Sequence, residues 1–410
     1  MALTHRSPLP GIGDAASARG ADHWLARCGL LRELAHPGEA IAMITPNWYA
    51  SVMGTGILAV AAASLPQQFP GFRAAATVGW ALTAFLLVVL SVATALHWIF
   101  HRATARRHHL DPVMAHFYGA PPMAMLTVGA GTLLLGSDWI GERAAVDVDW
   151  VLWFGGTLTG LLSAVAVPYL TFTRHRVEDQ SAFGGWLMPV VPPMVSATTG
   201  GMLLPHAPEG QARLTLLMAC LGMFGLSLLA SFVIITLIWR RLAIHKIGPA
   251  RMVPTLWIVL GPLGQSITAA NMLGGNAHLA IGAPYSQALA AFGVVYGVPV
   301  WGFAALWAGI ATMITLRAVR EHMPFSLTWW SFTFPVGTCV TGTSGLAAHT
   351  GAEMFTYAAG LLYLCLVSAW FIVAVRTVHG SLIRGTLLKP PAAPVAPVVT
   401  GRPAPVTSAS

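Results

Sequence analysis

The stretch WWSFTFPVGTCVTGTSG, residues 329–345, carries no charged side chain, so it is compatible with the interior of a membrane. It nevertheless contains a central proline, three glycines, four threonines and two serines. A proline inside a helix leaves a backbone carbonyl without its partner, and in a membrane such irregularity persists only where protein or water surrounds it. The stretch therefore predicts an irregular helix in the interior of a helical bundle.

The rest of the chain has the composition of a membrane protein. Of 410 residues, 56% are apolar and only 9% are charged, whereas soluble domains are about 25% charged. Apolar runs recur that are long enough to cross roughly 30 Å of hydrocarbon as a helix. We predict an all-α polytopic membrane protein with ten transmembrane helices, at residues 46–64, 75–100, 118–136, 149–173, 187–204, 213–239, 252–272, 287–316, 327–348 and 351–376.

This prediction divides the chain into three parts. Residues 1–43 form a cytoplasmic N-terminal tail, in which residues 24–34 have the pattern of an amphipathic helix lying on the membrane surface. Residues 44–378 form the transmembrane domain. Residues 379–410 form a cytoplasmic tail that is rich in proline and alanine and is expected to be disordered.

The basic residues predict the orientation. Nineteen of the 22 lysines and arginines fall in the tails or in the loops after even-numbered spans, while the other side holds only Arg73, Arg143 and Arg213. The positive-inside rule places both termini in the cytoplasm, in a multi-pass protein of the cytoplasmic membrane. The net charge of +8 thus describes a basic rim and predicts no nucleic-acid partner. Asp138, Glu142, Asp147, Asp149 and Glu209 are expected on the opposite, outer side.

Prolines reveal an internal repeat. Pro122, Pro192, Pro262 and Pro335 follow one another at intervals of 70, 70 and 73 residues, each in an odd-numbered span crowded with Gly, Ser and Thr. This period predicts five helical hairpins, with an inner ring of five kinked helices around a pore and an outer ring of five regular ones. Small residues also serve close helix packing, which is the alternative explanation for any single span.

Chemistry-bearing motifs are sparse. The middle of every predicted span lacks Lys, Arg, Asp and Glu, which favours a neutral path lined by hydroxyls over a carboxylate-driven pump. Cys28, Cys220, Cys339 and Cys365 are too scattered to predict a disulfide framework or a metal site. No catalytic motif appears, so we expect neither an enzyme nor a cofactor.

Histidines offer an alternative of another class. His97 and His101 are four residues apart, with His108, His109 and His116 nearby, so a membrane redox subunit that binds haem or a metal is conceivable. Their place at the end of a span, among arginines, favours solvated interfacial histidines instead.

Three motifs, PNWYASVMGTGILA (residues 46–59), MPVVPPMVSA (188–197) and WWSFTFPVGT (329–338), resemble the tellurite-resistance/dicarboxylate transporter family over about residues 43–378. That family includes the bacterial tellurite-resistance protein, fungal malate and sulfite permeases and plant slow anion channels. The resemblance implies a homotrimer whose protomers each have a pore plugged by a phenylalanine of the ninth helix. The motif assigns this gate to Phe334, with Phe332 as the alternative.

The resemblance implies an anion substrate. We expect transport of C4-dicarboxylates such as malate, with sulfite or another small inorganic anion as the alternative. At α-helical spacing Phe334 shares one face with Ser331, Thr338, Thr341 and Gly345. The predicted pore-lining residues are Gly54, Thr55, Thr127, Pro192, Ser196, Thr199, Pro262, Ser266, Ser331, Pro335, Thr338 and Thr341.

Overall fold

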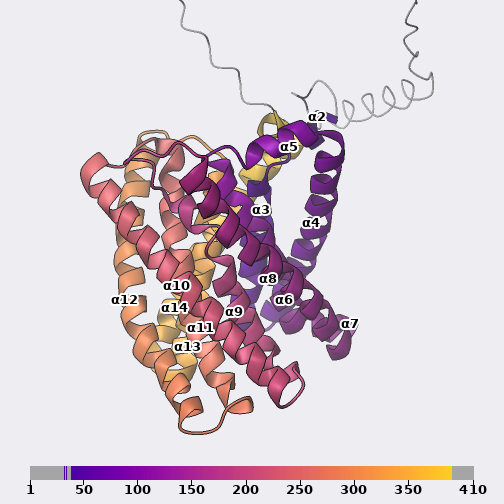
Figure 1. Ribbon diagram of the computed structural model, residues 1–410, viewed down its shortest axis with the longest axis vertical. Helices are drawn as coiled ribbons and strands as arrows, with labels where there is room; N and C mark the ends of the chain where they lie inside the picture. Colours follow the sequence, from indigo (N-terminus) through magenta and orange to yellow (C-terminus); the bar gives the residue numbers. More distant parts are fainter. Residues whose placement is uncertain (1–31, 33, 35–37, 390–410) are drawn as a thin grey trace, which may run out of the picture.

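The computed structural model describes residues 32, 34 and 38–389, and within these residues every regular element is a helix (Figure 1). The predicted all-α class is confirmed. Cys28 and most of the predicted surface helix at residues 24–34 lie outside the described residues. The predicted tail begins with ordered helical turns at His379–Ile383 and Thr386–Leu388, because Leu388 is buried and Leu387 packs on Gly380.

Seven helical stretches of the described chain are long and apolar enough to cross a membrane. Three smaller helices, α2 (Gly38–Ala42), α5 (Arg102–His108) and α7 (Ser137–Ile140), lie near the ends of the bundle. Figure 1 shows α5 and α7 at opposite ends, which are called the α5 end and the α7 end below. The seven stretches are α4 (Phe72–Phe100), Met114–Ile140 with α6 (Ala120–Gly131), α8 (Glu142–Thr173), α10 (Gln211–His245), Ala250–Leu279 with α11 (Leu260–Asn276), α12 (Tyr285–Arg320) and Glu353–Ile383 with α14 (Glu353–Val378).

Three further apolar helices are shorter. They are α3 (Tyr49–Ser64), α9 (Pro192–Leu203) and α13 (Phe334–Thr350), with 16, 12 and 17 residues. Nearly every side chain of these three helices is buried, whereas α4, α8, α10, α12 and α14 expose many large apolar side chains.

The repeated prolines Pro122, Pro192, Pro262 and Pro335 do not kink long helices as the sequence predicts, because each stands in the first turn of an α-helix. Pro168 and Pro299, by contrast, lie inside the long helices α8 and α12. Short 3-10 helices come first: η2 (Met114–Gly119), η4 (Gly184–Leu187), η6 (Ala250–Val259) and η8 (Leu327–Phe332). The helices α6, α9 and α13 then begin with proline in their first two positions. A first-turn proline costs no hydrogen bond, because the N–H that it lacks would have no partner inside the helix.

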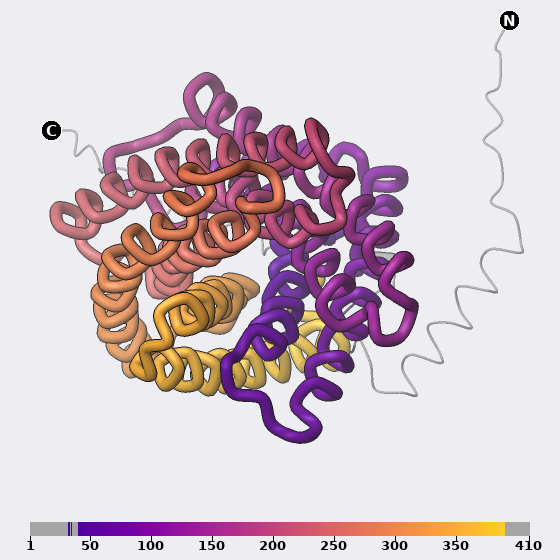
Figure 2. The backbone as a smooth tube through the Cα atoms, turned by 90° about the horizontal axis from the view of Figure 1, so that it is seen from below, coloured from indigo at the N-terminus to yellow at the C-terminus, as the bar shows by residue number. Residues whose placement is uncertain are grey.

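The buried helices contact one another in chain order. Each of α3, α6, α9 and α11 packs against the next, α13 packs against α3, and each packs against the long helix that follows it. Seen from the α7 end in Figure 2, α12 and α14 lie on the outer side of α13. Helices far apart in sequence, such as α3 and α13, are therefore neighbours in space.

Indole groups of the long helices satisfy the polar groups of these buried helices. Trp80 donates to Thr132 Oγ1 at 3.0 Å, Trp301 to Thr343 Oγ1 at 3.0 Å and Trp370 to Thr55 Oγ1 at 3.1 Å. Trp153 likewise donates to the carbonyl of Ser196 at 2.9 Å. Part of the hydroxyl content noted in the sequence thus serves contacts between helices, because a polar group in an apolar interior needs a partner.

Two buried helices come into close backbone contact at Gly264 of α11. A Cβ atom added there would lie 2.5 Å from the backbone nitrogen of Cys339 and 2.6 Å from the carbonyl carbon of Thr338 in α13. Backbone cannot move aside as a flexible side chain can. We therefore expect Gly264→Ala to destabilise the protein by about 1–3 kcal/mol or more, measured as a lower midpoint of thermal unfolding in detergent.

Gly225 of α10 is the matched control, because a Cβ atom added there meets nothing within 4 Å. Gly225→Ala is expected to leave stability unchanged or to raise it by up to about 1 kcal/mol, since alanine is the better helix former. Equal unfolding midpoints for both variants would contradict the close contact between α11 and α13.

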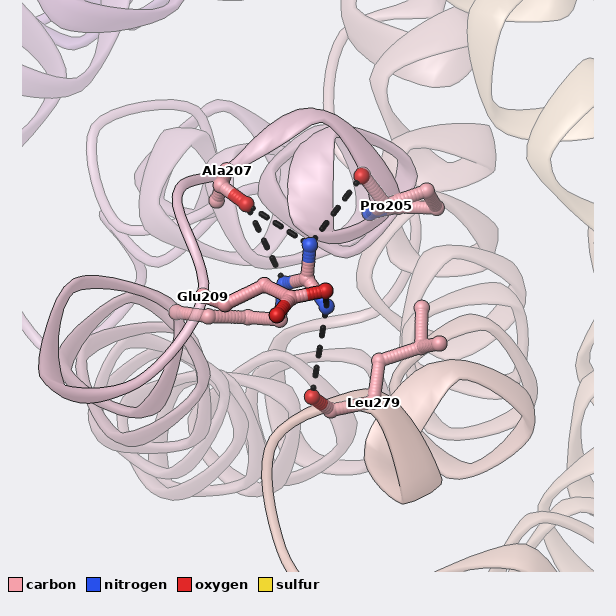
Figure 3. Close-up of polar contacts among 5 residues, drawn as sticks. Pro205, Ala207, Glu209 and Leu279 are labelled. Carbon is pink, nitrogen blue, oxygen red and sulfur yellow. Dashed lines mark hydrogen bonds and ion pairs between the residues drawn. The ribbon is translucent and has the colours of Figure 1, made fainter.

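Arg213, at the beginning of α10, joins two loops at the α7 end. Its guanidinium donates hydrogen bonds to the carbonyls of Pro205, Ala207 and Leu279, and Glu209 lies 4.0 Å away (Figure 3). One of the three basic residues on this side of the chain is therefore held by backbone carbonyls, which is a structural role.

Candidate functional site

Phe334 stands where the irregular and the regular parts of the ninth predicted span meet. The 3-10 helix η8 ends at Phe332, Thr333 interrupts the helix with φ −103° and ψ −73°, and α13 begins at Phe334. The side chain of Phe334 is only 3% exposed. Two cavities lie in contact with it, one toward each end of the bundle.

The cavity toward the α5 end is small, about 20 Å³, and mostly apolar. The 3-10 helices and the first turns of the buried helices form it. Its lining consists of Ala50, Met53, Phe117, Met123, Met188, Val191, Ile258, Gly261, Leu327, Trp330, Ser331, Phe334 and Pro335.

The cavity toward the α7 end has a volume of about 80 Å³ and a mixed lining, in which hydroxyls and one amide stand among apolar side chains; it is called the polar cavity below. Gln265 Nε2 donates to Thr198 Oγ1 at 2.9 Å, and the hydroxyls of Thr268 and Thr341 are 2.8 Å apart. All five buried helices, α3, α6, α9, α11 and α13, contribute to its wall, and the polar residues of the lining are Ser64, Thr127, Thr198, Thr199, Gln265, Thr268 and Thr341.

A wider vestibule of about 540 Å³ opens at the α7 end. It shares Leu134, Met202 and Met272 with the polar cavity, so the two spaces adjoin. Two acidic side chains, Asp138 and Glu142, belong to its lining. Asp138 forms an ion pair with Arg73 at 2.7 Å, and Glu142 lies 4.0 Å from His206.

The predicted pore-lining residues divide into two groups. Ser331, Pro335, Thr127, Thr199 and Thr341 line one or the other of the cavities beside Phe334. The other seven belong to neither lining. Four are in contacts between helices: Gly54 lies against Trp330 and Thr333, Pro192 against Gly160 and Thr338 against Gly264, and Pro262 is buried in α11. The remaining three take part in hydrogen bonds with aromatic side chains: Thr55 with Trp370, Ser266 with Tyr296 and the carbonyl of Ser196 with Trp153.

The predicted common face of the ninth span is interrupted, which is a correction. Ser331 belongs to the 3-10 helix and Phe334 to the α-helix, so the α-helical spacing does not run from one to the other. Within α13, Thr338 turns to the backbone carbonyls of α11 while Thr341 reaches the cavity.

Gln265, Thr198, Thr268 and Ser64 were not predicted from the sequence. Of these four, Gln265 could have been predicted from the sequence. It is an amide three residues after Pro262, in GPLGQSITAA, a run otherwise made of apolar and small residues. An amide there needs a polar neighbour or water.

Two charged residues are more buried than predicted. The sequence places Asp149 outside the membrane, but it lies within α8 with 0% exposure. Arg241, expected on the open basic rim, is 8% exposed and donates hydrogen bonds to the carbonyls of Ala182, Lys246 and Ile247. Asp149 lies seven positions after the first residue of α8, so the prediction that the middle of each span lacks ionisable residues is not contradicted.

Three of the histidines that suggested a redox centre lie together at the α5 end, while His116 packs against Phe183 and Trp186. The ring of His97 stacks on those of His108 and His101, with centroids 5.3 and 6.0 Å apart. Burial and the neighbouring His97 hold the pKa of His108 below its ordinary value. Among the described residues, no group of three or more His, Cys, Asp and Glu side chains is arranged to hold a metal ion.

Comparison with known proteins matches residues 43–378 to the profile of the voltage-dependent anion channel (SLAC1) family. An uncharacterized transporter of Methanocaldococcus jannaschii is 27% identical over 83% of this chain and 94% of its own length. A sulfite efflux pump of Trichophyton rubrum is 27% identical over 83% of this chain and 92% of its own. A malic acid transport protein of Schizosaccharomyces pombe is 22% identical over 84% of this chain and 80% of its own.

Proposed function

The chain belongs to the voltage-dependent anion channel family, and we propose that it carries small anions through its own helical bundle, along a path closed by Phe334. The family match confirms the resemblance seen in the sequence motifs, and membership makes the chain an anion transporter or channel. The path, the gate and the substrate are the parts that we propose.

One observation carries the proposed path. Among the described residues, Phe334 alone belongs to the lining of both cavities, and the polar cavity adjoins the vestibule through shared residues. From the α5 end to the α7 end, the order is therefore the small apolar cavity, the ring of Phe334, the polar cavity and the vestibule. A ring at that point closes the way, and its movement would open it.

We propose that α3, α9 and α13 cross the membrane together with the seven longer stretches, as five hairpins in two rings. The cyclic contacts among α3, α6, α9, α11 and α13 support this arrangement. The repeat supports it as well, because residues about 70 positions apart meet on neighbouring buried helices. Gln265 bonds Thr198 and Thr268 lies beside Thr341 on these helices, and Gly119 lies against the carbonyl of Met188 in the segments just before α6 and α9.

We further propose that the α5 end faces the cytoplasm, in the cytoplasmic membrane. Arg143 and Arg240 are both exposed. Arg143 lies at the beginning of α8, directly after α7, whereas Arg240 lies near the end of α10, which begins at the α7 end. With the native cysteines replaced by alanine, a cysteine at Arg143 is expected to react with an impermeant thiol reagent from outside intact cells. A cysteine at Arg240 is expected to react only in opened membranes; the reverse pattern would invert the orientation. Arg241, being buried, is unsuitable for this test.

The family resemblance also predicts a homotrimer. Light scattering of the protein in detergent, corrected for bound detergent, measures this directly. A particle with the mass of three chains is the expected result, and one with the mass of a single chain would contradict it.

The polar cavity favours a small, singly charged substrate. Its lining contains hydroxyls and an amide but no cation, and the cost of removing an anion from water rises steeply with its charge. A cavity needs a volume of about 10–15 Å³ to hold one water molecule. A cavity of about 80 Å³ is therefore small. Hydrogensulfite fits these limits better than a malate dianion, and the related sulfite pump adds weight. Malate, the first prediction from the sequence, stays the second candidate because of the related malic acid transporter.

The test is a flux panel with purified protein in proteoliposomes, comparing sulfite, nitrate, chloride and malate with and without a pH gradient. Protein-dependent flux of sulfite above that of malate is the expected result. The absence of flux for every anion, together with stoichiometric haem or metal in the purified protein, would instead support the redox alternative.

A further inference from the structure

Asp149 carries a buried carboxyl that the anion path does not use. It lies seven positions after the first residue of α8, about 10 Å along the helix from the α7 end. Its exposure is 0%, and neither carboxyl oxygen has a hydrogen-bond partner among the described residues. An ionised carboxylate that is buried and unpaired costs several kcal/mol, so in this conformation the group holds a proton.

The carboxyl lies directly against the backbone of a pore helix. A Cβ atom added to Gly129 of α6 would overlap Asp149 Oδ1, so the two helices meet at this point. Thr127, two positions earlier on α6, lines the polar cavity. Two α-helical positions turn by about 200°, so Asp149 touches the back of the helix whose front forms the cavity.

The backbone changes its winding just beyond this contact. Residues Thr132–Gly136 form a π-helical turn that also packs on α8. Such turns are rare in proteins, and many of those that occur are found at functional sites. They interrupt the regular ladder of helix hydrogen bonds. The α6 segment in contact with Asp149 therefore adjoins an irregular turn.

The surroundings offer Asp149 no fixed counter-charge. Of the described elements with extensive contacts to α8, α6, α9 and the π-helical turn contain no titratable side chain, and the 3-10 helix η2 contributes His116 and Tyr118. Asp138 of α7 is paired with Arg73. The other charged residues of α8 are exposed: Glu142, Arg143 and Asp147.

From this geometry we propose that Asp149 is a proton-binding site that couples anion movement to the movement of a proton. The inference rests on the proposed function. The carboxylate takes one proton from water at the α7 end and becomes the neutral acid, which allows α8 to close on Gly129. It returns the proton toward the α5 end, and only when α6 and α8 separate enough to let water from that side hydrate the carboxylate. Separation shifts α6, and with it the wall of the polar cavity.

The first experiment measures accumulation of radiolabelled chloride in proteoliposomes with the membrane potential held at zero, because chloride, unlike hydrogensulfite, keeps the same charge at neutral to alkaline pH. With one proton per anion, a gradient of one pH unit corresponds to about tenfold accumulation for the wild type. For Asp149→Asn, which has the shape of the neutral acid but cannot ionise, the accumulation ratio is expected to fall to about one. Asp147→Asn, an exposed position on the same helix, is the matched control and is expected to behave as wild type. A tenfold ratio retained in Asp149→Asn overturns the proposal.

A second readout does not depend on transport. Infrared spectroscopy of the wild type is expected to show the carbonyl stretch of a protonated carboxylic acid at neutral pH, which Asp149→Asn removes and Asp147→Asn keeps. An identical band in wild type and Asp149→Asn, or no band in either, overturns the assignment even if a variant is inactive. Loss of all anion flux in the wild type, with the band present, would refute the proposed function and leave the proton on Asp149 in place.

Discussion

Replacement of Phe334 by alanine is expected to raise anion flux per folded protein by about tenfold, which corresponds to about 1.4 kcal/mol of barrier. The ring separates the apolar cavity from the polar one, and its removal joins the two spaces. The same change removes a buried aromatic side chain and is expected to cost about 3–5 kcal/mol of stability. Flux is therefore measured in proteoliposomes and normalised to the amount of folded protein.

Phe332→Ala is the matched control. Phe332 packs edge-on against Trp257 and Trp329, at centroid distances of 5.5 and 5.7 Å, and belongs to neither cavity lining. Its replacement is expected to lower stability and to leave flux unchanged. If Phe332→Ala raised flux while Phe334→Ala did not, the gate would move to Phe332.

The second large effect is expected at Gln265. Gln265→Glu keeps the size of the side chain but places an acid within the polar cavity, beside Thr198. Two like charges about 4 Å apart repel by about 4 kcal/mol at an effective dielectric constant of about 20, which would reduce anion flux by up to about a thousandfold. The loss should be greatest at high pH and should diminish as the pH falls, because protonation removes the repelling charge.

Gln287→Glu supplies the control, because Gln287 is exposed near the beginning of α12 and gains the same charge outside the cavity. It is expected to retain wild-type flux over the whole pH range. A Gln265→Glu protein that folds and transports normally at high pH would show that anions do not pass this residue.

The membrane character of the chain was predictable because it depends on local properties. A run of apolar side chains long enough to span the hydrocarbon is visible without knowledge of the fold. The proline, glycine and hydroxyl residues in 329–345 are visible in the same way, and they predict an irregular buried helix. The family was predictable too, since its motifs are contiguous in sequence.

The assignment of single residues to the path was only partly predictable. Thr127, Thr199 and Thr341 line the polar cavity. Thr55 and Ser266 instead accept hydrogen bonds from Trp370 and Tyr296, which belong to the long helices. Hydroxyl residues of both kinds look alike in sequence. Their roles differ because of the rotation of each helix about its axis, which neighbouring helices determine.

The sequence by itself determined the helical membrane class, the family and the position of Phe334 beside a proline. Only the tertiary structure decided that the helix changes from 3-10 to α winding at Thr333, which alters the face on which each later residue lies. It also decided that Gln265 lies beside Thr198 and that Asp149 lies on Gly129. Those pairs are 67 and 20 residues apart in the chain, and their proximity follows from helix packing, a long-range interaction that local sequence patterns do not encode.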